Sequence, residues 1–192
     1  MHDAFFKYLK KFDSEPLTKD EKSIIIKAFS PTKLRKRQYF SHAGNHCKHF
    51  AFIVKGAMRQ YLVNNKGTEL IIKVGIENWW MGDRESFVFG TPSLYHIDAW
   101  EDTEMLIIAR EDFLKLKKIN AIAMMIAHLD ERNSIANQKR IASFISLTAE
   151  QRYVDFVTWY PQLVSRFPQH IIASYLGITK DTLSRVKVHL KK

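Results

Sequence analysis

The spacing of apolar and polar residues changes twice along this chain. Residues 1–30 repeat apolar side chains at helical spacing, and this pattern stops at Pro31. From residue 32 to 108, short apolar runs alternate with turn residues, as expected for strands. After Arg110 the helical spacing returns and continues to the end of the chain. The chain is therefore predicted to form helices, then an antiparallel roll or sandwich of strands, then helices again.

The strand-like part contains six apolar runs separated by turn signals, at residues 38–40, 50–54, 58–63, 69–74, 95–100 and 104–109. The sequence Asn-Asn-Lys-Gly at residues 64–67 separates two of these runs, and such a sequence is typical of a hairpin turn. Regular spacing of short strands favours an antiparallel roll or sandwich.

Three helices are predicted after the strands, at residues 111–118, 121–145 and 147–159. The second has no Gly or Pro, and a helix of ~24 residues is about 36 Å long. Its apolar stripe suits a two-fold dimer seam, since pairing of two copies buries the same stripe on both. The alternative is that the stripe packs on its own domain.

Residues 169–188 resemble a helix-turn-helix DNA reader. Ile172, Ala173 and Leu176 give the first short helix an apolar stripe, and Gly177 stands where a tight turn favours positive φ. Thr179 is suited to cap the second helix through its hydroxyl. Leu183 and Val186, three residues apart, would face back to the first helix.

The outward side chains of the second helix form the predicted DNA-binding surface. A helix from Thr179 to about Leu190 is expected in the major groove, with Arg185 as the base reader because its guanidinium fork suits guanine. Lys180 and Ser184 are the next candidates for base contacts, and Thr182, Lys187 and Gln169 are assigned to phosphates. The complete set is Gln169, Thr179, Lys180, Asp181, Thr182, Ser184, Arg185 and Lys187.

Composition supports a polyanionic partner. The 192 residues carry a net charge of +10, and residues 137–192 alone hold nine Lys or Arg against three Asp or Glu. The single cysteine excludes an intramolecular disulfide. The N-terminal residues do not look like a secretory signal, and no apolar stretch approaches the ~20 residues that span a bilayer. A cytoplasmic protein without a membrane partner is expected.

The order of parts resembles the Crp/Fnr family of bacterial transcription regulators. The residues that carry the resemblance are 50–59, similar to the family's strand–glycine–strand segment, and 168–185. Trp80-Met81-Gly82-Asp83 falls where family members have a Gly-Glu pair, and residues 99–104 resemble the strand that follows it. The resemblance implies a cyclic-nucleotide-binding-like β-roll and a winged-helix domain in a homodimer. Double-stranded DNA is then the main partner, and RNA polymerase is a further candidate.

The segment that would bind a cyclic phosphate departs from the family. Cyclic-nucleotide binders of the family carry an Arg-Ser or Arg-Thr pair there, whereas residues 91–96 contain no arginine. The nearest arginine, Arg84, lies about ten residues earlier, and Asp83 replaces the ribose-contacting Glu. We therefore predict no tight binding of cyclic AMP or cyclic GMP and leave the effector unknown. Arg84 or His96 could serve another anion. The candidate effector pocket is formed by Trp80, Gly82, Asp83, Arg84, Ser93 and His96.

The expected fold is α+β, a double-stranded β-helix joined by a long dimer helix to a helix-turn-helix. Its wing is expected to be short or replaced by a turn, because only eight residues separate Trp159 from Pro168. The predicted domains are a sensory roll with its N-terminal helices (1–118), a connecting and dimerisation helix (119–145) and a DNA-binding domain (146–192).

Two other kinds of site receive less support. His42, His46, Cys47 and His49 lie within eight residues, but their spacing matches no helical pair and no CxxC, so we predict surface histidines and no metal site. No catalytic set is present, since neither HExxH nor a phosphate-cradling loop occurs. The alternative to a DNA-binding regulator is a ligand-binding or protein-interaction module with a vestigial helix-turn-helix.

Overall fold

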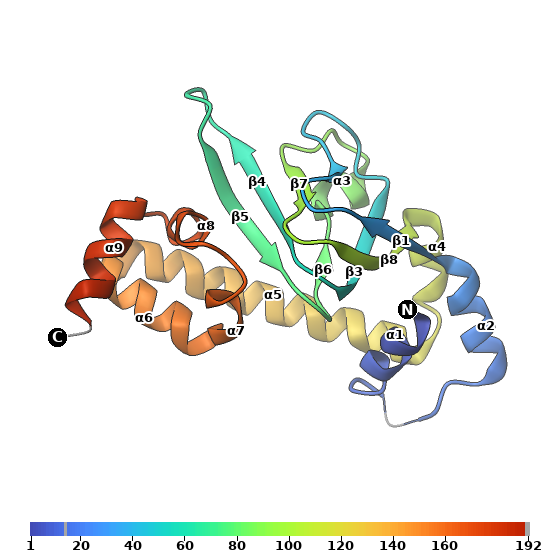
Figure 1. The fold of residues 1–192 in the computed structure, drawn as a ribbon. Coiled ribbons are helices and arrows are strands. Elements are labelled where there is room, and N and C mark those ends of the chain that lie inside the picture. Colours follow the sequence, from blue (N-terminus) through green and yellow to red (C-terminus); the bar gives the residue numbers. More distant parts are fainter. Residues whose placement is uncertain (14, 191–192) are drawn as a thin grey trace. The chain divides into compact units, whose positions relative to one another are not determined.

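The computed structural model describes residues 1–13 and 15–190, which form two compact units (Figure 1). The first unit contains residues 1–13, 15–62 and 73–130, and the second contains residues 63–72 and 131–190. Two strands and one long helix therefore continue from one unit into the other. The division is not a single cut along the chain, because residues 63–72 of the β4–β5 hairpin belong to the same unit as the C-terminal helices.

The strands form two four-stranded sheets with the orders β1-β8-β3-β6 and β2-β7-β4-β5, which confirms the predicted antiparallel β-roll. The helices before the sheets are α1 (His2–Leu9) and α2 (Lys19–Ala28). The strands and the two helices among and after them are β1 (Phe29–Leu34), β2 (Tyr39–Ser41), β3 (His49–Lys55), β4 (Met58–Val63), β5 (Glu69–Gly75), β6 (Trp80–Met81), α3 (Arg84–Phe89), β7 (His96–Ala99), β8 (Thr103–Ala109) and α4 (Arg110–Leu116).

Alternation along the strands divides the apolar side chains between two cores. One core contains Ala51, Ile53, Met58, Met81, Ile97 and Met105, contributed by both sheets. Phe52 and Leu106 are the neighbours of core residues in β3 and β8, so they point to the other face, where they pack with Phe5 and Leu9 of α1. β3 is consequently buried on both faces, which is why its sequence reads as a continuous apolar run.

Two turns depend on glycine as predicted. Gly56, between β3 and β4, has φ +99°, and a Cβ there would lie 2.8 Å from the Cα of Thr103. In the hairpin between β4 and β5, the Gly67 amide donates to the Asn64 carbonyl at 2.9 Å. The close approach at Gly56 places the turn between β3 and β4 against the start of β8.

The long helix α5 (Asn120–Ser146) matches the predicted helix closely. Its first half packs on its own unit, where Ala121, Ile122 and Met125 are buried, so the apolar stripe is core there. The stretch from residue 131 to 139 is exposed on every side. The two halves of the helix therefore have different surroundings, although the sequence pattern is continuous.

Four helices complete the second unit: α6 (Ala149–Trp159), α7 (Pro161–Val164), α8 (Gln169–Tyr175) and α9 (Lys180–His189). A capping box starts α6, since Thr148 accepts from the Gln151 amide while the Gln151 side chain accepts from Thr148. Residues 160–168 hold the single turn α7 and contain no strand, which agrees with the predicted reduction of the wing.

Candidate DNA-binding surface and effector pocket

Helices α8 and α9 are joined by a tight turn that has the predicted geometry. Gly177 adopts φ +66°, and the Ile178 amide reaches back to the Ala173 carbonyl at 3.0 Å. Leu183 and Val186 are buried, as are Ile172, Ala173 and Leu176 on the facing helix. The apolar contact between the two helices therefore forms as the spacing predicts, and it holds α9 against α8.

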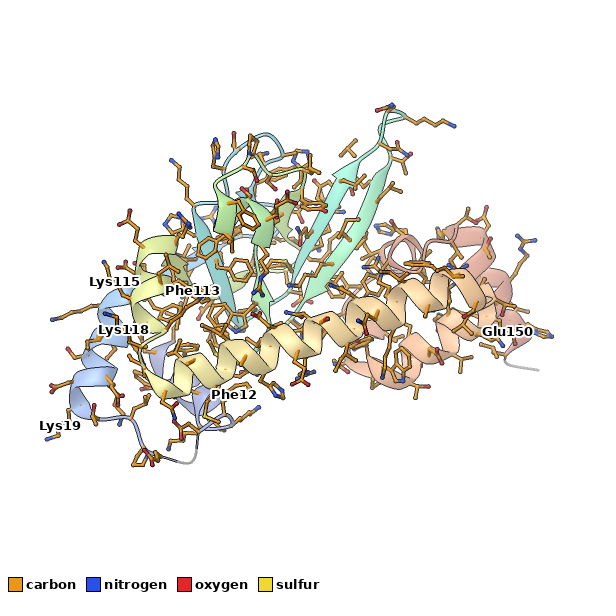
Figure 2. The ribbon with its side chains drawn as sticks, turned by 180° about the vertical axis from the view of Figure 1, so that it is seen from behind. Phe12, Lys19, Phe113, Lys115, Lys118 and Glu150 are labelled. Atoms are coloured by element: carbon orange, nitrogen blue, oxygen red, sulfur yellow. The ribbon has the colours of Figure 1, made fainter. Side chains whose placement is uncertain are left out.

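The first turn of α9 is capped by Thr179. Its Oγ1 accepts from the Thr182 amide at 3.1 Å, and the two hydroxyls are 2.9 Å apart. At its other end, His189 pairs with Glu150 of α6 at 3.0 Å; Glu150 is labelled in Figure 2. α9 is thus bound at both ends, while Ser184 and Arg185 in its middle are exposed.

The structure places all eight predicted DNA-contacting residues on α9, its cap and the start of α8. Lys180, Asp181, Ser184 and Arg185 are exposed, and Thr182, Lys187 and Gln169 are half-buried. Ser184 donates to the Gln169 side chain at 3.3 Å, which links the two helices on this face. The outward surface of α9 carries Lys180, Arg185 and Lys187 as its cations, and the apolar Val188 is also exposed there.

Several residues that support this surface have no signal in the sequence. Arg152 of α6 donates to the Leu176 carbonyl at 2.8 Å, beside the turn. The ring of Phe144 lies under Gly177, where a Cβ would approach the Phe144 Cε1 to 2.8 Å. Contacts between helices so far apart in the chain depend on the packing of the unit, so local patterns do not reveal them.

The predicted effector residues near α3 serve the local structure. The Asp83 carboxylate caps α3, accepting from the amides of Glu85 and Ser86 at 3.1 and 3.3 Å. Gly82 lies against the ring of Phe50, so a side chain at residue 82 would overlap that ring. Both residues are therefore committed to the entry into α3.

Ser93 lies in the segment 91–96, which the resemblance matches to the family's phosphate-binding segment. It is buried, its Oγ accepts from the Tyr95 amide at 3.1 Å, and its own amide donates to the Asn45 carbonyl at 2.9 Å. Because the Ser93 side chain is a neutral hydroxyl that hydrogen-bonds within its own loop, it provides no positive charge at the expected phosphate position.

Arg84, His96 and Trp80 lie in three different environments. Arg84 makes a bidentate ion pair with Asp130 of α5, in which its Nη2 is 2.7 Å from Oδ2, and this hydrogen bonding raises the pKa of Arg84. His96 stacks on Tyr61, with ring centroids 5.4 Å apart. Trp80 is buried among the aromatic rings around Phe5. The candidate effector pocket formed by these six residues stays a prediction.

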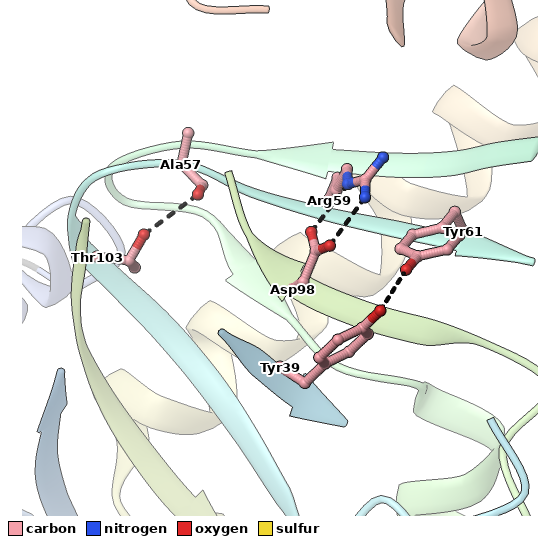
Figure 3. A network of polar contacts seen from close by, with 6 residues as sticks. All are labelled: Tyr39, Ala57, Arg59, Tyr61, Asp98 and Thr103. Carbon is pink, nitrogen blue, oxygen red and sulfur yellow. Dashed lines mark hydrogen bonds and ion pairs between the residues drawn. The ribbon is translucent and has the colours of Figure 1, made fainter. Parts of the chain in front are cut away.

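The roll contains a buried arginine that sequence reasoning did not single out. Figure 3 shows Arg59 of β4 and Asp98 of β7 facing each other, with Nε–Oδ1 and Nη2–Oδ2 distances of 2.9 Å. The Arg59 guanidinium also lies 4.4 Å from the centroid of Tyr61, whose hydroxyl is 3.2 Å from that of Tyr39. Because Arg59 and Asp98 are opposite each other in the sheet register, this pair could be found only after strand pairing was known.

The histidine-rich loop is held by contacts with residues of α3 and the segment that follows it. His46 Nδ1 is 2.7 Å from the Gly90 carbonyl, and Cys47 is buried, which raises the pKa of its thiol. Within residues 1–13 and 15–190, no three His, Cys, Asp or Glu side chains are grouped so that they could hold a metal ion. No helix among the same residues is long and apolar enough to cross a bilayer.

Comparison with known proteins identifies the roll and the fold. Residues 31–120 match the cyclic nucleotide-binding domain family. A search of curated proteins finds no match. Among solved structures, FixK2 from Bradyrhizobium japonicum has 18% identity and a TM-score of 0.72, covering 85% of this chain and 84% of its own. CooA from Carboxydothermus hydrogenoformans has 17% identity and a TM-score of 0.73, covering 96% and 84%. The catabolite activator protein of Thermus thermophilus has 20% identity and a TM-score of 0.56, covering 96% and 86%.

Proposed function

We propose that this chain, which has the fold of the Crp/Fnr regulators and a cyclic nucleotide-binding domain at residues 31–120, is a sequence-specific DNA-binding transcription regulator that acts as a homodimer in the cytoplasm. The observation that carries the proposal is the outward face of α9. Lys180 and Arg185 project from a helix whose opposite face is anchored by Leu183 and Val186. A rigid, cationic and exposed helix is what entry into a major groove requires.

The side chains of this face divide by chemistry. Arg185 has the fork that pairs with guanine O6 and N7, so it is the proposed base reader, with Lys180 and Ser184 beside it. Thr182, Lys187 and Gln169 lie at the margins of the face and are assigned to phosphates. Thr179 and Asp181 lie at the N-terminus of α9, where the helix dipole attracts a phosphate of the DNA backbone.

The exposed half of α5 supports the homodimer. Ile135 is 46% and Ile145 is 81% exposed, and both lie with Ala142 on one stripe of the helix. Pairing of two copies along this stripe would bury these side chains symmetrically and present two α9 helices to half-sites about one turn of DNA apart. The functional parts are then the roll (1–118), the dimer helix (119–145) and the DNA-binding part (146–192). RNA polymerase is a candidate partner only through the family resemblance.

The residues present do not fit a cyclic phosphate bound as in the cyclic-nucleotide-binding members of the family. Ser93 brings no cation to the phosphate position, Asp83 is engaged as a helix cap, and the fork of Arg59 is taken by Asp98. Burying a phosphate without a facing cation is costly. Calorimetric titration with cyclic AMP and cyclic GMP should therefore show no binding at micromolar concentration. Micromolar affinity for either nucleotide would show that this interpretation of the roll is wrong.

Selection of sites from random duplex DNA tests the proposed function. The purified protein should enrich a pseudo-palindromic site, and its affinity should fall steeply with salt. Lys118→Ala is a matched control, because it removes one exposed positive charge from the first unit (Figure 2) and leaves α9 intact. If no sequence is enriched and binding to duplex DNA is absent at low salt, an interaction module with a vestigial helix-turn-helix explains the chain better.

A further inference from the structure

The hairpin made by the end of β4 and the start of β5 belongs to the second unit together with α6–α9. β5 is an edge strand, since its single neighbour in the sheet is β4. The outer side of an edge strand presents backbone N–H and C=O groups without a strand partner. Here those groups are bound by side chains from helices of the same unit.

Ser174 of α8 binds two groups of this edge with one hydroxyl. Its Oγ accepts from the Ile71 amide at 2.9 Å and donates to the Glu69 carbonyl at 3.2 Å. Groups two residues apart point to the same side of a strand, so the hydroxyl spans one repeat of the edge. A slip of α8 along β5 by one residue would break both hydrogen bonds.

Arg140 of α5 binds both β5 and α8. Its guanidinium donates to the carbonyls of Ile72 and Ile71 on the edge, at 2.5 and 3.4 Å, and to the Tyr175 carbonyl of α8 at 3.2 Å. It also lies 4.2 Å from the centroid of the Tyr175 ring. One planar cation therefore joins three segments that are distant in sequence.

We propose that Arg140 and Ser174 are positioning residues for DNA recognition, which set the orientation of α8 and α9 by clasping them to residues 63–72. The inference rests on the proposed function and makes the hairpin a part of the DNA-binding machinery.

The physical consequence concerns specificity more than affinity. Two α9 helices in a dimer must meet two half-sites at one spacing and one angle, and a helix pair fixed in advance loses less orientational freedom on binding. Non-specific binding needs only positive charge near phosphates and places little demand on orientation. Loss of the clasp should therefore weaken binding to the selected site and widen the tolerated half-site spacing, while binding to random duplex DNA stays the same.

The test compares Ser174→Ala, Ser174→Thr and Arg140→Lys in the full chain. Ser174→Ala loses two hydrogen bonds, so affinity for the selected duplex should fall about tenfold. Inserting one base pair between the half-sites should then reduce the affinity of this variant less than it reduces the affinity of the unchanged protein. Ser174→Thr keeps the hydroxyl and should restore both properties. Arg140→Lys keeps the positive charge, so any loss of affinity for the selected site measures the contribution of the planar guanidinium. Ser165→Ala and Arg132→Lys are matched controls at exposed positions of the same unit.

Exchange of the Ile71 amide gives a readout that needs no DNA. It should be protected in the unchanged protein and exchange faster in Ser174→Ala, because the hydroxyl is its acceptor. A merely structural role predicts an equal loss on selected and random duplexes together with a lower unfolding midpoint, and that result would overturn the proposal. Unchanged or increased specific affinity in Ser174→Ala would also overturn it. If the unchanged protein selects no site, the proposed function itself fails, which is a separate result.

Discussion

The carboxylate of Asp98 is paired with the guanidinium of Arg59 through two hydrogen bonds of 2.9 Å, and the two side chains are only 5% and 10% exposed. Removal of one partner leaves a buried charge without compensation. Arg59→Met should therefore lower the free energy of unfolding by about 3–5 kcal/mol, whereas the double variant Arg59→Met/Asp98→Leu should recover much of that loss. Urea unfolding of both variants measures the difference.

An exposed pair is the control for this first prediction. Lys33 and Glu104 are 2.7 Å apart, and the lysine is 70% exposed. Lys33→Met should leave the unfolding midpoint nearly unchanged, because water replaces the lost contact. Equal effects at Arg59 and Lys33 would contradict the account of the buried pair.

Replacement of Arg185 tests the assignment of a base reader. Arg185→Ala should cost ~1–3 kcal/mol of affinity for the selected site and blur preference at one base pair of each half-site. Lys118→Ala should retain the full preference. A site selection on the Arg185 variant that returns an unchanged motif would rule out the assigned role.

Gly177 is predicted to tolerate no side chain. Its φ of +66° is unfavourable for alanine, and a Cβ would lie 2.8 Å from the Phe144 ring. Gly177→Ala should lower the free energy of unfolding by about 1–3 kcal/mol. Gly67→Ala has a similar φ of +76° but no atom within 4 Å of the new Cβ, so the difference between the two variants isolates the contact with Phe144. Thermal unfolding of both proteins is the measurement.

Lys73 of β5 makes stability depend on pH in the alkaline range. Loss of hydration, with a smaller contribution from Arg84, lowers the pKa of Lys73 from 10.5 to about 8. Between these two values the unfolded chain binds more protons than the folded chain, so the contribution of Lys73 to the free energy of unfolding rises with pH from 8 to 10.5. Well below pH 8 the destabilising charge is fully present.

Subtraction of a Lys73→Met variant isolates this contribution. The difference in unfolding free energy between the variant and the unchanged protein should shrink by about 1–3 kcal/mol as the pH rises through this range. Urea unfolding at several pH values gives the two curves. A constant difference would show that Lys73 titrates normally.

The exposed stripe on α5 gives a prediction about assembly. Ile135→Lys places a charge in the proposed seam and should weaken dimerisation at least about tenfold, because the charge must be desolvated on pairing. Asn133→Lys adds the same charge on the opposite side of the helix and should leave the dimer intact. Sedimentation at micromolar protein concentration compares the two. Dimers of equal strength would exclude this stripe as the seam.

Local sequence patterns predicted the helix pair and its turn correctly, since Gly177, Thr179 and the Leu183–Val186 spacing act within one or two turns of chain. Apolar alternation likewise predicted the roll. The candidate effector pocket stays a prediction, since local patterns do not show how its residues are arranged. Trp80, Arg84 and His96 have partners that depend on which strands and helices become neighbours, and no local pattern indicates that Arg84 pairs with Asp130.

The amino-acid order alone determined the order of helices, roll and helices and the positions of most elements, because capping, turn conformation and amphipathic spacing involve neighbours along the chain. It did not reveal β1 or α3. Only the tertiary structure decided which polar groups meet: Arg59 with Asp98, 39 residues apart, and Ser174 with Glu69, 105 residues apart. Such pairs depend on sheet register and helix packing, and these arise from the burial of apolar surface by the whole chain at once.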